Sequence, residues 1–229
     1  MFSSLAIWCD EEPHAGAENM ALDQILLESD HAEPILRVYA WSQPTVSFGY
    51  FHSLQDAQAC FPPDADEDLR YIRRWTGGGV VDHRVDVTYT LIIPRSEKLA
   101  HVRGAESYRV IHLALAKALE GMGQSVQMNE ISGGGDLSCF SNPVPYDLSD
   151  LAGKKIAGAG QRRSRHGLLH QGSIVSALNN DLVRDLLPEL LGVSLSSNSH
   201  FFQPDQGIFE QALSLAEIRY GSRGWLNKK

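Results

Sequence analysis

Cysteines are few in this sequence, and none of them are arranged to hold a metal or a disulfide framework. The 229 residues include three, Cys9, Cys60 and Cys139, which lie far apart. An odd number at such spacing argues against a disulfide-stapled secreted domain and against a structural zinc site. We therefore expect a cytoplasmic protein with at least one free thiol and no bound metal.

Long apolar runs are missing as well. No stretch approaches the ~18 apolar residues that indicate a membrane-spanning helix. The first residues, Met1 to Trp8, have no basic lead, and acidic residues follow at once. A secretory signal has the opposite character. The expectation is a protein that neither enters a membrane nor carries an export signal.

Positive charge is in deficit, since the formal net charge is −8. This balance argues against general binding of nucleic acid. One short stretch nevertheless contains basic residues and no acidic ones. Its basic members are Lys154, Lys155, Arg162, Arg163 and Arg165. Two interpretations stay open for this stretch, a contact for a phosphate or an acidic partner domain, and a solvated surface.

The remaining composition, 43% hydrophobic and 21% charged, is that of an ordinary globular protein. The length suits a single domain spanning 1–229. Apolar spacing predicts helices over 17–28, 106–121, 181–191 and 206–219. It predicts strands over 35–41, 45–49, 71–75 and 85–93, and a hairpin of 155–161 with 168–175. Strands and helices alternate without a regular βαβ order, so the predicted class is α+β.

The most informative run is Arg73-Arg74-Trp75-Thr76-Gly77-Gly78-Gly79, with His83 four residues further on. Three consecutive glycines let the backbone approach another group closely and adopt conformations that other residues resist. Here they stand between arginines and a predicted strand. This context favours a loop whose amides face a polar or anionic ligand, although an ordinary glycine turn has the same composition.

A second run, Gly153-Lys154-Lys155-Ile156-Ala157-Gly158-Ala159-Gly160-Gln161, precedes Leu169-His170-Gln171-Gly172-Ser173. With the glycine loop, these segments resemble the superfamily of lipoate and biotin protein ligases and octanoyltransferases. The resemblance extends over most of the chain. It implies a central, mainly antiparallel mixed sheet flanked by helices, as in biotin ligases and class II aminoacyl-tRNA synthetases.

Within that superfamily, the sequence most resembles the cysteine-dependent octanoyltransferases and amidotransferases, with lipoate–protein ligase A as the near relative. The residue that points to this branch is Cys139, which is followed by Phe140. In this branch the corresponding cysteine accepts the acyl chain as a thioester. A thiolate is a good nucleophile, and a nearby cation lowers its pKa. The competing interpretation of Cys139 is a small buried apolar residue.

Lys155 matches the lysine of the superfamily motif, so the resemblance implies a catalytic role for it. Its ammonium group has the charge to stabilise an oxyanion or polarise an acyl group. The alternative is a surface lysine like its neighbour Lys154, which points to the opposite face of a strand.

The resemblance also implies an acyl-binding pocket, and matched motif positions supply its candidate residues. These candidates are Arg74, Thr76, Gly77, Gly78, Gly79, His83, Gly158, Gln161, His170 and Gly172. His83 is interpreted as a proton carrier or as a hydrogen-bond anchor. Three positions depart from the octanoyltransferase pattern: Gly79 is ligase-like, Gly160 replaces an alanine, and His170-Gln171 fits neither branch.

These observations favour transfer of an octanoyl or lipoyl group to a specific lysine of a lipoyl-carrier domain through a Cys139 thioester. The implied donor is acyl carrier protein or another lipoyl domain. The implied acceptor is a lipoyl domain such as glycine-cleavage H protein or a dehydrogenase E2 subunit. The 154–165 stretch would be the docking surface. Such a transferase requires no cofactor, and we expect a monomer.

Two other functions remain open. An ATP-dependent lipoate–protein ligase would work through a lipoyl-adenylate, with ATP and Mg²⁺ as cofactors and with a separate accessory domain. A degenerate member would bind acyl groups or partner domains without catalysis. A biotin ligase is disfavoured, because the Cys139-Phe140 pair and the Arg162-Arg163 run resemble the lipoate-specific members of the superfamily.

Overall fold

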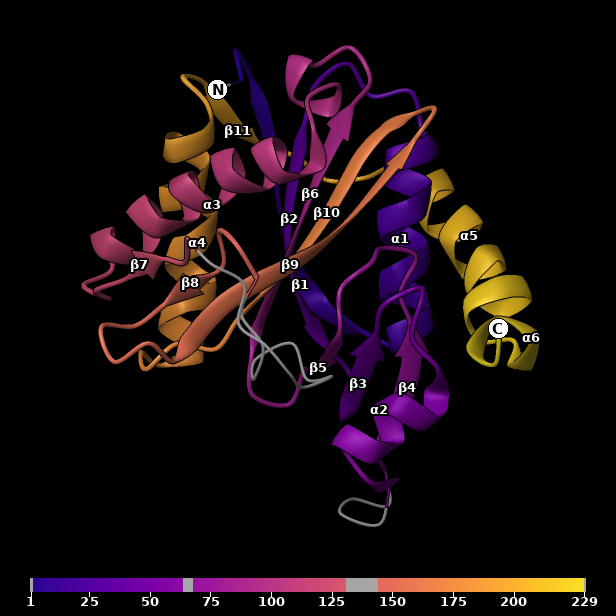
Figure 1. The fold of residues 1–229 in the computed structure, drawn as a ribbon. Coiled ribbons are helices and arrows are strands. Elements are labelled where there is room, and N and C mark those ends of the chain that lie inside the picture. Colours follow the sequence, from indigo (N-terminus) through magenta and orange to yellow (C-terminus); the bar gives the residue numbers. More distant parts are fainter. Residues whose placement is uncertain (1, 64–67, 131–143, 229) are drawn as a thin grey trace.

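A computed structural model describes residues 2–63, 68–130 and 144–228. Its main feature is a twisted eight-stranded sheet that runs through the middle of the molecule (Figure 1). In spatial order the strands are β11 (Ser199–Phe201), β1 (Leu5–His14), β2 (Ile35–Trp41), β6 (Val87–Pro94), β10 (Gly167–Ile174), β9 (Lys155–Ser164), β8 (Leu148–Ser149) and β7 (Gln127–Met128). Strand β1 pairs in parallel with β11 and β2, and every other neighbouring pair in this sheet is antiparallel. The predicted α+β class and mainly antiparallel mixed sheet are therefore confirmed.

Two layers of helices cover the sheet, one on each face (Figure 1). One face packs against α3 (Gly104–Gly121) and α4 (Asn180–Leu195), and the other against α1 (Gly16–Glu28) and α5 (Gln206–Leu215). Alternation along β6 explains why both faces are apolar. Tyr89 and Leu91 enter the core under α3 and α4, whereas Ile92 enters the core under α1 and α5.

A second, three-stranded sheet carries the glycine loop. Strand β3 (Thr45–Phe48) lies between β4 (Arg70–Arg73), which is parallel to it, and β5 (Val80–Asp82), which is antiparallel. Its small core includes Val46, Phe48 and Val80, and α2 (Leu54–Cys60) packs there through Ala57. Because the glycine loop connects β4 to β5, this sheet holds both ends of the loop.

Three short helical segments complete the fold. They are a 3₁₀ turn at Lys98–Ala100, a π-helical turn at Ala216–Tyr220 and α6 (Arg223–Leu226). The π-helical turn continues α5, so the helix predicted over 206–219 is made of two pieces. The N-terminal strand β1, the short helix α2 and the short strands β5, β7, β8 and β11 were not predicted.

A buried network of charged side chains connects β1, β2 and α1. The Arg37 side chain is fully buried and donates to Asp10 Oδ2 at 2.6 Å and to Asp23 Oδ1 at 2.8 Å. Asn19 Oδ1 accepts a further bond at 2.7 Å. Burial opposes the charged guanidinium, but the two carboxylates outweigh this effect and raise the pKa of Arg37. The network fixes the register of helix α1 against the sheet.

In the described ranges, none of the helices combines the length and the apolar character needed to span a bilayer.

Candidate active site

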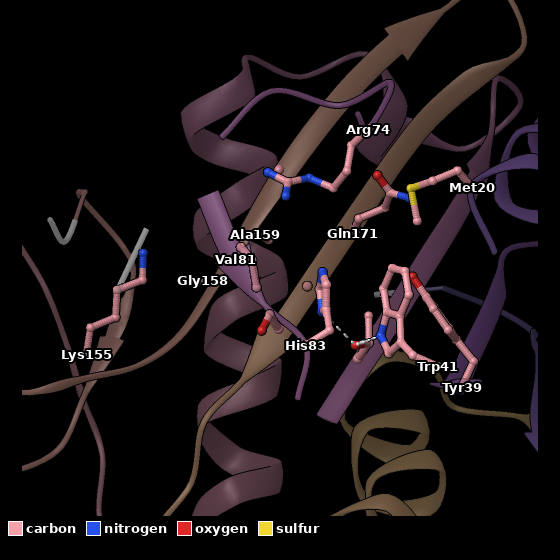
Figure 2. A pocket seen from close by; sticks show the side chains of 14 residues that line it. Met20, Tyr39, Trp41, Arg74, Val81, His83, Lys155, Gly158, Ala159 and Gln171 are labelled. Atoms are coloured by element: carbon pink, nitrogen blue, oxygen red, sulfur yellow. Dashed lines mark hydrogen bonds between the residues drawn. The ribbon is translucent and has the colours of Figure 1, made fainter. Parts of the chain in front are cut away.

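A pocket opens where the two sheets meet, and it contains about 410 Å³ of space, part of it open to solvent. Its lining residues are Met20, Tyr39, Trp41, Arg74, Val81, His83, Thr88, Lys155, Gly158, Ala159, Gly160, Gln171, Gly172 and Ser173. Figure 2 shows Lys155 at one side of the pocket and Met20, Tyr39 and Trp41 at the other, with His83 between them. The pocket therefore has a charged end and a largely apolar end.

Glycines in the β9–β10 hairpin create the space at the charged end. Antiparallel pairing places Gly172 opposite Ala159, and Ser173 opposite Gly158. A Cβ atom at Gly158 would come within 2.6 Å of Lys155 Nζ, and one at Gly172 would come within 2.2 Å of the Tyr89 ring. Both contacts are far shorter than van der Waals distance, so these two positions require glycine for the lysine and the tyrosine to fit.

Lys155 is buried, and a carboxylate holds its ammonium group in place. Its Nζ atom lies 2.7 Å from Asp147 Oδ2. The other oxygen of Asp147 accepts a bond from the Tyr108 hydroxyl at 2.5 Å, and that hydroxyl accepts one from the Ala159 amide at 2.8 Å. Burial and the neighbouring Asp147 raise the pKa of Tyr108 well above its ordinary value, so it donates as a neutral phenol. The interpretation of Lys155 as a surface lysine is wrong.

Backbone strain is located directly beside this ion pair. Tyr146 has a φ of 73°, and it is the one residue other than glycine with a positive φ among the described residues. Its amide donates to Asn129 O at 2.7 Å, and its carbonyl accepts from His112 Nδ1 at 2.7 Å. Such a conformation persists only where surrounding contacts hold it. These contacts thereby set the position of Asp147, the partner of Lys155.

His170 lies behind the pocket and does not line it, so the structure does not support its predicted place there. It is fully buried, with its Nε2 atom 3.2 Å from the Tyr89 hydroxyl and its Nδ1 atom 3.0 Å from Gln161 Nε2. Burial, and secondarily the neighbouring His112, hold the pKa of His170 well below its ordinary value. Burial also lowers the pKa of His112 to about 4. Both rings are neutral at pH 7 and act as packing and hydrogen-bonding groups.

These buried histidines predict a loss of stability in mild acid. Because the folded-state pKa of His112 is lowered, the unfolded chain binds more protons than the folded chain between about pH 6.5 and pH 4. The stabilisation is complete above that range and is lost as the pH falls through it, by roughly 3 kcal/mol for this one group. We expect His112→Gln to lose less stability than the wild type between pH 7 and pH 5, measured by urea unfolding. His101→Gln, at an exposed position, is the control, and equal pH slopes in wild type and His112→Gln would contradict the prediction.

Arg74 supports the glycine loop from inside. Its guanidinium donates to Ser47 Oγ at 2.6 Å and to the carbonyls of Gly77 and Gly79 at 3.2 and 2.9 Å. Of the three loop glycines, Gly78 has a positive φ, at 91°. The loop is thus a turn built around an arginine. In this conformation the carbonyls of Gly77 and Gly79 point toward that cation.

His83 is anchored at both ring nitrogens. Its Nδ1 atom lies 2.8 Å from Asp86 Oδ2, and its Nε2 atom lies 2.5 Å from Ser47 Oγ. The ring stacks on Trp41 with centroids 4.0 Å apart. Because Arg74 donates to the same serine, a chain of hydrogen bonds runs from the arginine through Ser47 and His83 to Asp86. This geometry matches the hydrogen-bond anchor of the two predicted roles.

The predicted site residues divide into two groups in the structure. Those that line the pocket are Arg74, His83, Lys155, Gly158 and Gly172. Those that lie outside the lining of this pocket are Thr76, Gly77, Gly78, Gly79, Gln161 and His170. A member of the second group supports the pocket wall, because Thr76 donates to Oε1 of the lining residue Gln171 at 2.7 Å. Cys139 lies outside the described residues.

Sequence reasoning missed most of the apolar lining, notably Met20, Trp41 and Val81. These are ordinary hydrophobic residues on separate elements, and no local motif marks them. Gln171 was noted as a departure from pattern. Its amide nitrogen donates to Asp23 Oδ2 at 2.7 Å and contacts Met20 Sδ at 3.4 Å, so it joins the pocket wall to the buried charge network.

The 154–165 stretch does not form one basic surface. It extends along β9, and consecutive side chains point to opposite faces of a strand. Arg162 lies over the Trp75 and Tyr50 rings, whereas Arg163 donates to Val102 O at 3.0 Å and Ser107 Oγ at 2.6 Å on the side of α3. Lys154 is exposed at the far end of the strand. The predicted docking surface is therefore incorrect as a continuous patch.

The family model of the lipoyl protein ligase A/B catalytic domain matches residues 15–197. The chain belongs to this family. The matched range contains every residue that lines the pocket, from Met20 to Ser173, and it also contains Cys139. The sequence resemblance to lipoate ligases and octanoyltransferases is thereby confirmed.

Curated relatives within the lipoyl protein ligase A/B family are named octanoyltransferase LipM. The protein from Carboxydothermus hydrogenoformans is 34% identical over 172 residues, which cover 73% of this chain and 63% of that protein. The protein from Brevibacillus brevis is 31% identical over 195 residues, covering 77% and 67%. The chain thus spans about two thirds of the length of these relatives.

Solved structures of family members share the fold. A bi-partite lipoate protein ligase from Thermoplasma acidophilum, studied with its E2 lipoyl domain, aligns with a TM-score of 0.78 at 18% identity and covers 99% of this chain and 98% of its own. Lipoate-protein ligase A bound with ATP aligns with a TM-score of 0.77 at 19% identity, covering 97% and 98%. At these identities the likeness establishes the fold alone.

Proposed function

We propose that this chain transfers an octanoyl group from a thioester donor to a specific lysine of a lipoyl domain, through a thioester on Cys139. The observation that carries the proposal is the buried Lys155–Asp147 pair at one end of a pocket with an apolar far end. The names of the curated relatives support the same reaction.

We infer from its lining that the pocket binds the acyl chain. Met20, Trp41 and Val81 line it with apolar surface, which favours the transfer of methylene groups from water. The ammonium group of Lys155 lies at the opposite end, where the carbonyl of a bound acyl group would stand. A fixed charge in a site of low polarity stabilises an oxyanion more strongly than the same charge in water. We infer that Lys155 supplies this stabilisation.

The reaction consists of two acyl exchanges. In the first, the Cys139 thiolate attacks the carbonyl of the donor thioester, and the donor leaves as a thiol after taking up a proton. In the second, the neutral amine of the acceptor lysine attacks the enzyme thioester, an amide forms, and the thiol of Cys139 is regenerated. Both exchanges conserve atoms and charge without ATP, so the proposed transferase requires no cofactor. A free thiol nucleophile also requires a reducing compartment, which the cytoplasm provides.

Donor and acceptor are proposed by chemistry and by family. The donor is octanoyl-acyl carrier protein or an octanoylated lipoyl domain, and the acceptor is a lipoyl domain such as H protein or an E2 subunit. An E2 lipoyl domain was studied with the Thermoplasma acidophilum ligase, which has the same fold.

The decisive experiment is intact-mass measurement after mixing the protein with octanoyl-acyl carrier protein in the absence of ATP. We expect a gain of one octanoyl group that hydroxylamine removes and that Cys139→Ser lacks. Cys60→Ser is the matched control, since Cys60 lies on α2 and outside the pocket lining. Formation of an acyl-adenylate with ATP and Mg²⁺, together with no acylation in their absence, would replace the transferase by a lipoate–protein ligase.

A further inference from the structure

Aromatic rings and cations alternate on the surface around α6. We call this surface the cation–aromatic face. Its members are Tyr50, Phe51, Trp75, Arg162, Arg219, Trp225 and Lys228. They come from the turn after β3, the end of β4, strand β9, the π-helical turn and α6, so the tertiary fold alone assembles them. In Figure 1, α6 lies below α5 on the side of the molecule that α1 covers.

Stacking holds the three cations in fixed positions. The guanidinium carbon of Arg162 lies 5.1 Å from the centre of the Tyr50 ring and 4.9 Å from that of Trp75. Arg219 lies 4.0 Å from the centre of the Trp225 ring, and it also donates to Gln24 at 3.0 Å. Lys228 Nζ lies 4.5 Å from the centre of the Tyr50 ring and bonds its hydroxyl. Cations ordered in this way lose little side-chain freedom when a partner binds.

These cations also lack intramolecular compensation. Within residues 2–63, 68–130 and 144–228, no carboxylate forms an ion pair with Arg162, Arg219 or Lys228. The chain as a whole has a net charge of −8. A compact group of positive charges on a negative protein orients an acidic partner toward that one face.

Phe51 provides an apolar anchor at the centre of contact. Its side chain is 87% exposed, although a ring of this size is normally buried. It packs edge-on against Tyr50 with centroids 5.1 Å apart. An exposed aromatic ring bordered by cations has the composition of a protein-binding hot spot, where aromatic residues and arginine contribute most of the affinity.

The face adjoins the pocket through two backbone connections. Arg162 lies on the same side of β9 as Gly158 and Gly160, which line the pocket, because alternate residues of a strand share a face. The Tyr50 amide donates to Thr76 O at 2.9 Å, directly before the loop glycines. The face and the pocket wall are therefore connected through the same strand and the same loop.

We propose that the cation–aromatic face docks an acidic lipoyl domain that carries the acceptor lysine. The proposal rests on the proposed function, since it assigns the partner's position for that reaction. Negative side chains of the partner meet Arg162, Arg219 and Lys228, and an apolar side chain of the partner covers Phe51. Bound in this way, the lipoyl domain presents its acceptor lysine to the pocket.

The test uses substitutions of exposed residues in the face, with matched control substitutions elsewhere on the surface. Phe51→Ala and Lys228→Glu alter the face, whereas Phe201→Ala on β11, where the ring is 80% exposed, and Lys117→Glu on α3 make the same changes far from it. With an apo-lipoyl domain as the probe, we expect the two face variants to weaken binding roughly tenfold and to raise the KM for that domain with kcat unchanged. Lys228→Glu should also reduce the salt dependence of binding.

Direct binding separates failure of this proposal from failure of the proposed function. Autoacylation by a small octanoyl thioester without a carrier protein tests the reaction alone, and both face variants should retain it. Unchanged binding of the apo-lipoyl domain to the face variants would overturn the docking proposal, even if octanoyl-acyl carrier protein bound them more weakly, and so would equal losses in the control variants. If the face variants weakened binding of ATP instead, the cations would serve a nucleotide and the docking proposal would be wrong.

Discussion

Replacing Lys155 by methionine is expected to lower both the stability and the activity of the protein. The substitution leaves the Asp147 carboxylate buried and without its cation, and breaking a buried ion pair in this way costs about 3–5 kcal/mol. Acylation should fall by at least about 100-fold, because a group that stabilises an oxyanion contributes on that scale. Urea unfolding measures the first effect, and the rate of the intact-mass gain measures the second.

A second substitution separates the two effects. In Lys155→Met/Asp147→Asn no charge remains buried at this place. The amide oxygen of the introduced asparagine still accepts the Tyr108 hydroxyl proton, and only the amide of Val144, a residue that is 44% exposed, loses its acceptor. We expect most of the stability to return while acylation stays lost. Recovery of activity in the double variant would show that Lys155 serves the fold alone.

Replacing Gly160 by alanine is expected to displace the glycine loop. A Cβ atom at this position would lie 2.4 Å from Gly77 O and 3.0 Å from Thr76 Oγ1. The clash is with backbone on one side, so the loop itself must shift. Overpacking of this kind costs about 1–3 kcal/mol. A displacement of ~1 Å at the pocket wall reduces the rate by up to about 100-fold.

Gly77→Ala is the matched control for stability, because a Cβ atom there meets nothing within 4 Å. We expect its free energy of unfolding to stay within about 0.5 kcal/mol of the wild type. Thermal unfolding and single-turnover acylation compare the two variants. If Gly160→Ala kept the wild-type rate and stability, the prediction would be wrong, because the glycine loop would accommodate the added methyl group. Alanine is the usual residue at position 160 in the superfamily that the sequence resembles. The same experiment therefore tests whether this chain accepts the usual residue.

Periodicity predicted the elements that bury one regular face. Strand β6 alternates between two cores, and helix α3 repeats apolar residues at helical spacing, so each was evident locally. Strand β1 was overlooked because its first residues were considered only as a possible export signal. Helix α2 had a readable signal in the capping box formed by Ser53 and Asp56, but with only seven residues it has little apolar periodicity.

The motifs located the charged end of the pocket but not its apolar end. Lys155, Gly158 and Gly172 follow from local patterns, because chemistry and close packing restrict those positions to one residue type. Met20 and Trp41 resemble any other core residues, and only their convergence from α1 and β2 makes them a pocket wall. Their role depends on strand order and helix placement, which no local pattern encodes.

The amino-acid sequence by itself determined the fold class, the family and the lysine at the centre of the site, because these depend on periodicity and on short runs of restricted residues. The tertiary structure alone decided that Asp147 pairs with that lysine, that His170 lies behind the pocket, and that Arg162 stacks on Trp75. The physical reason is distance along the chain. Contacts between residues far apart in sequence are selected by packing and charge compensation in the folded state, and the local sequence carries little trace of them.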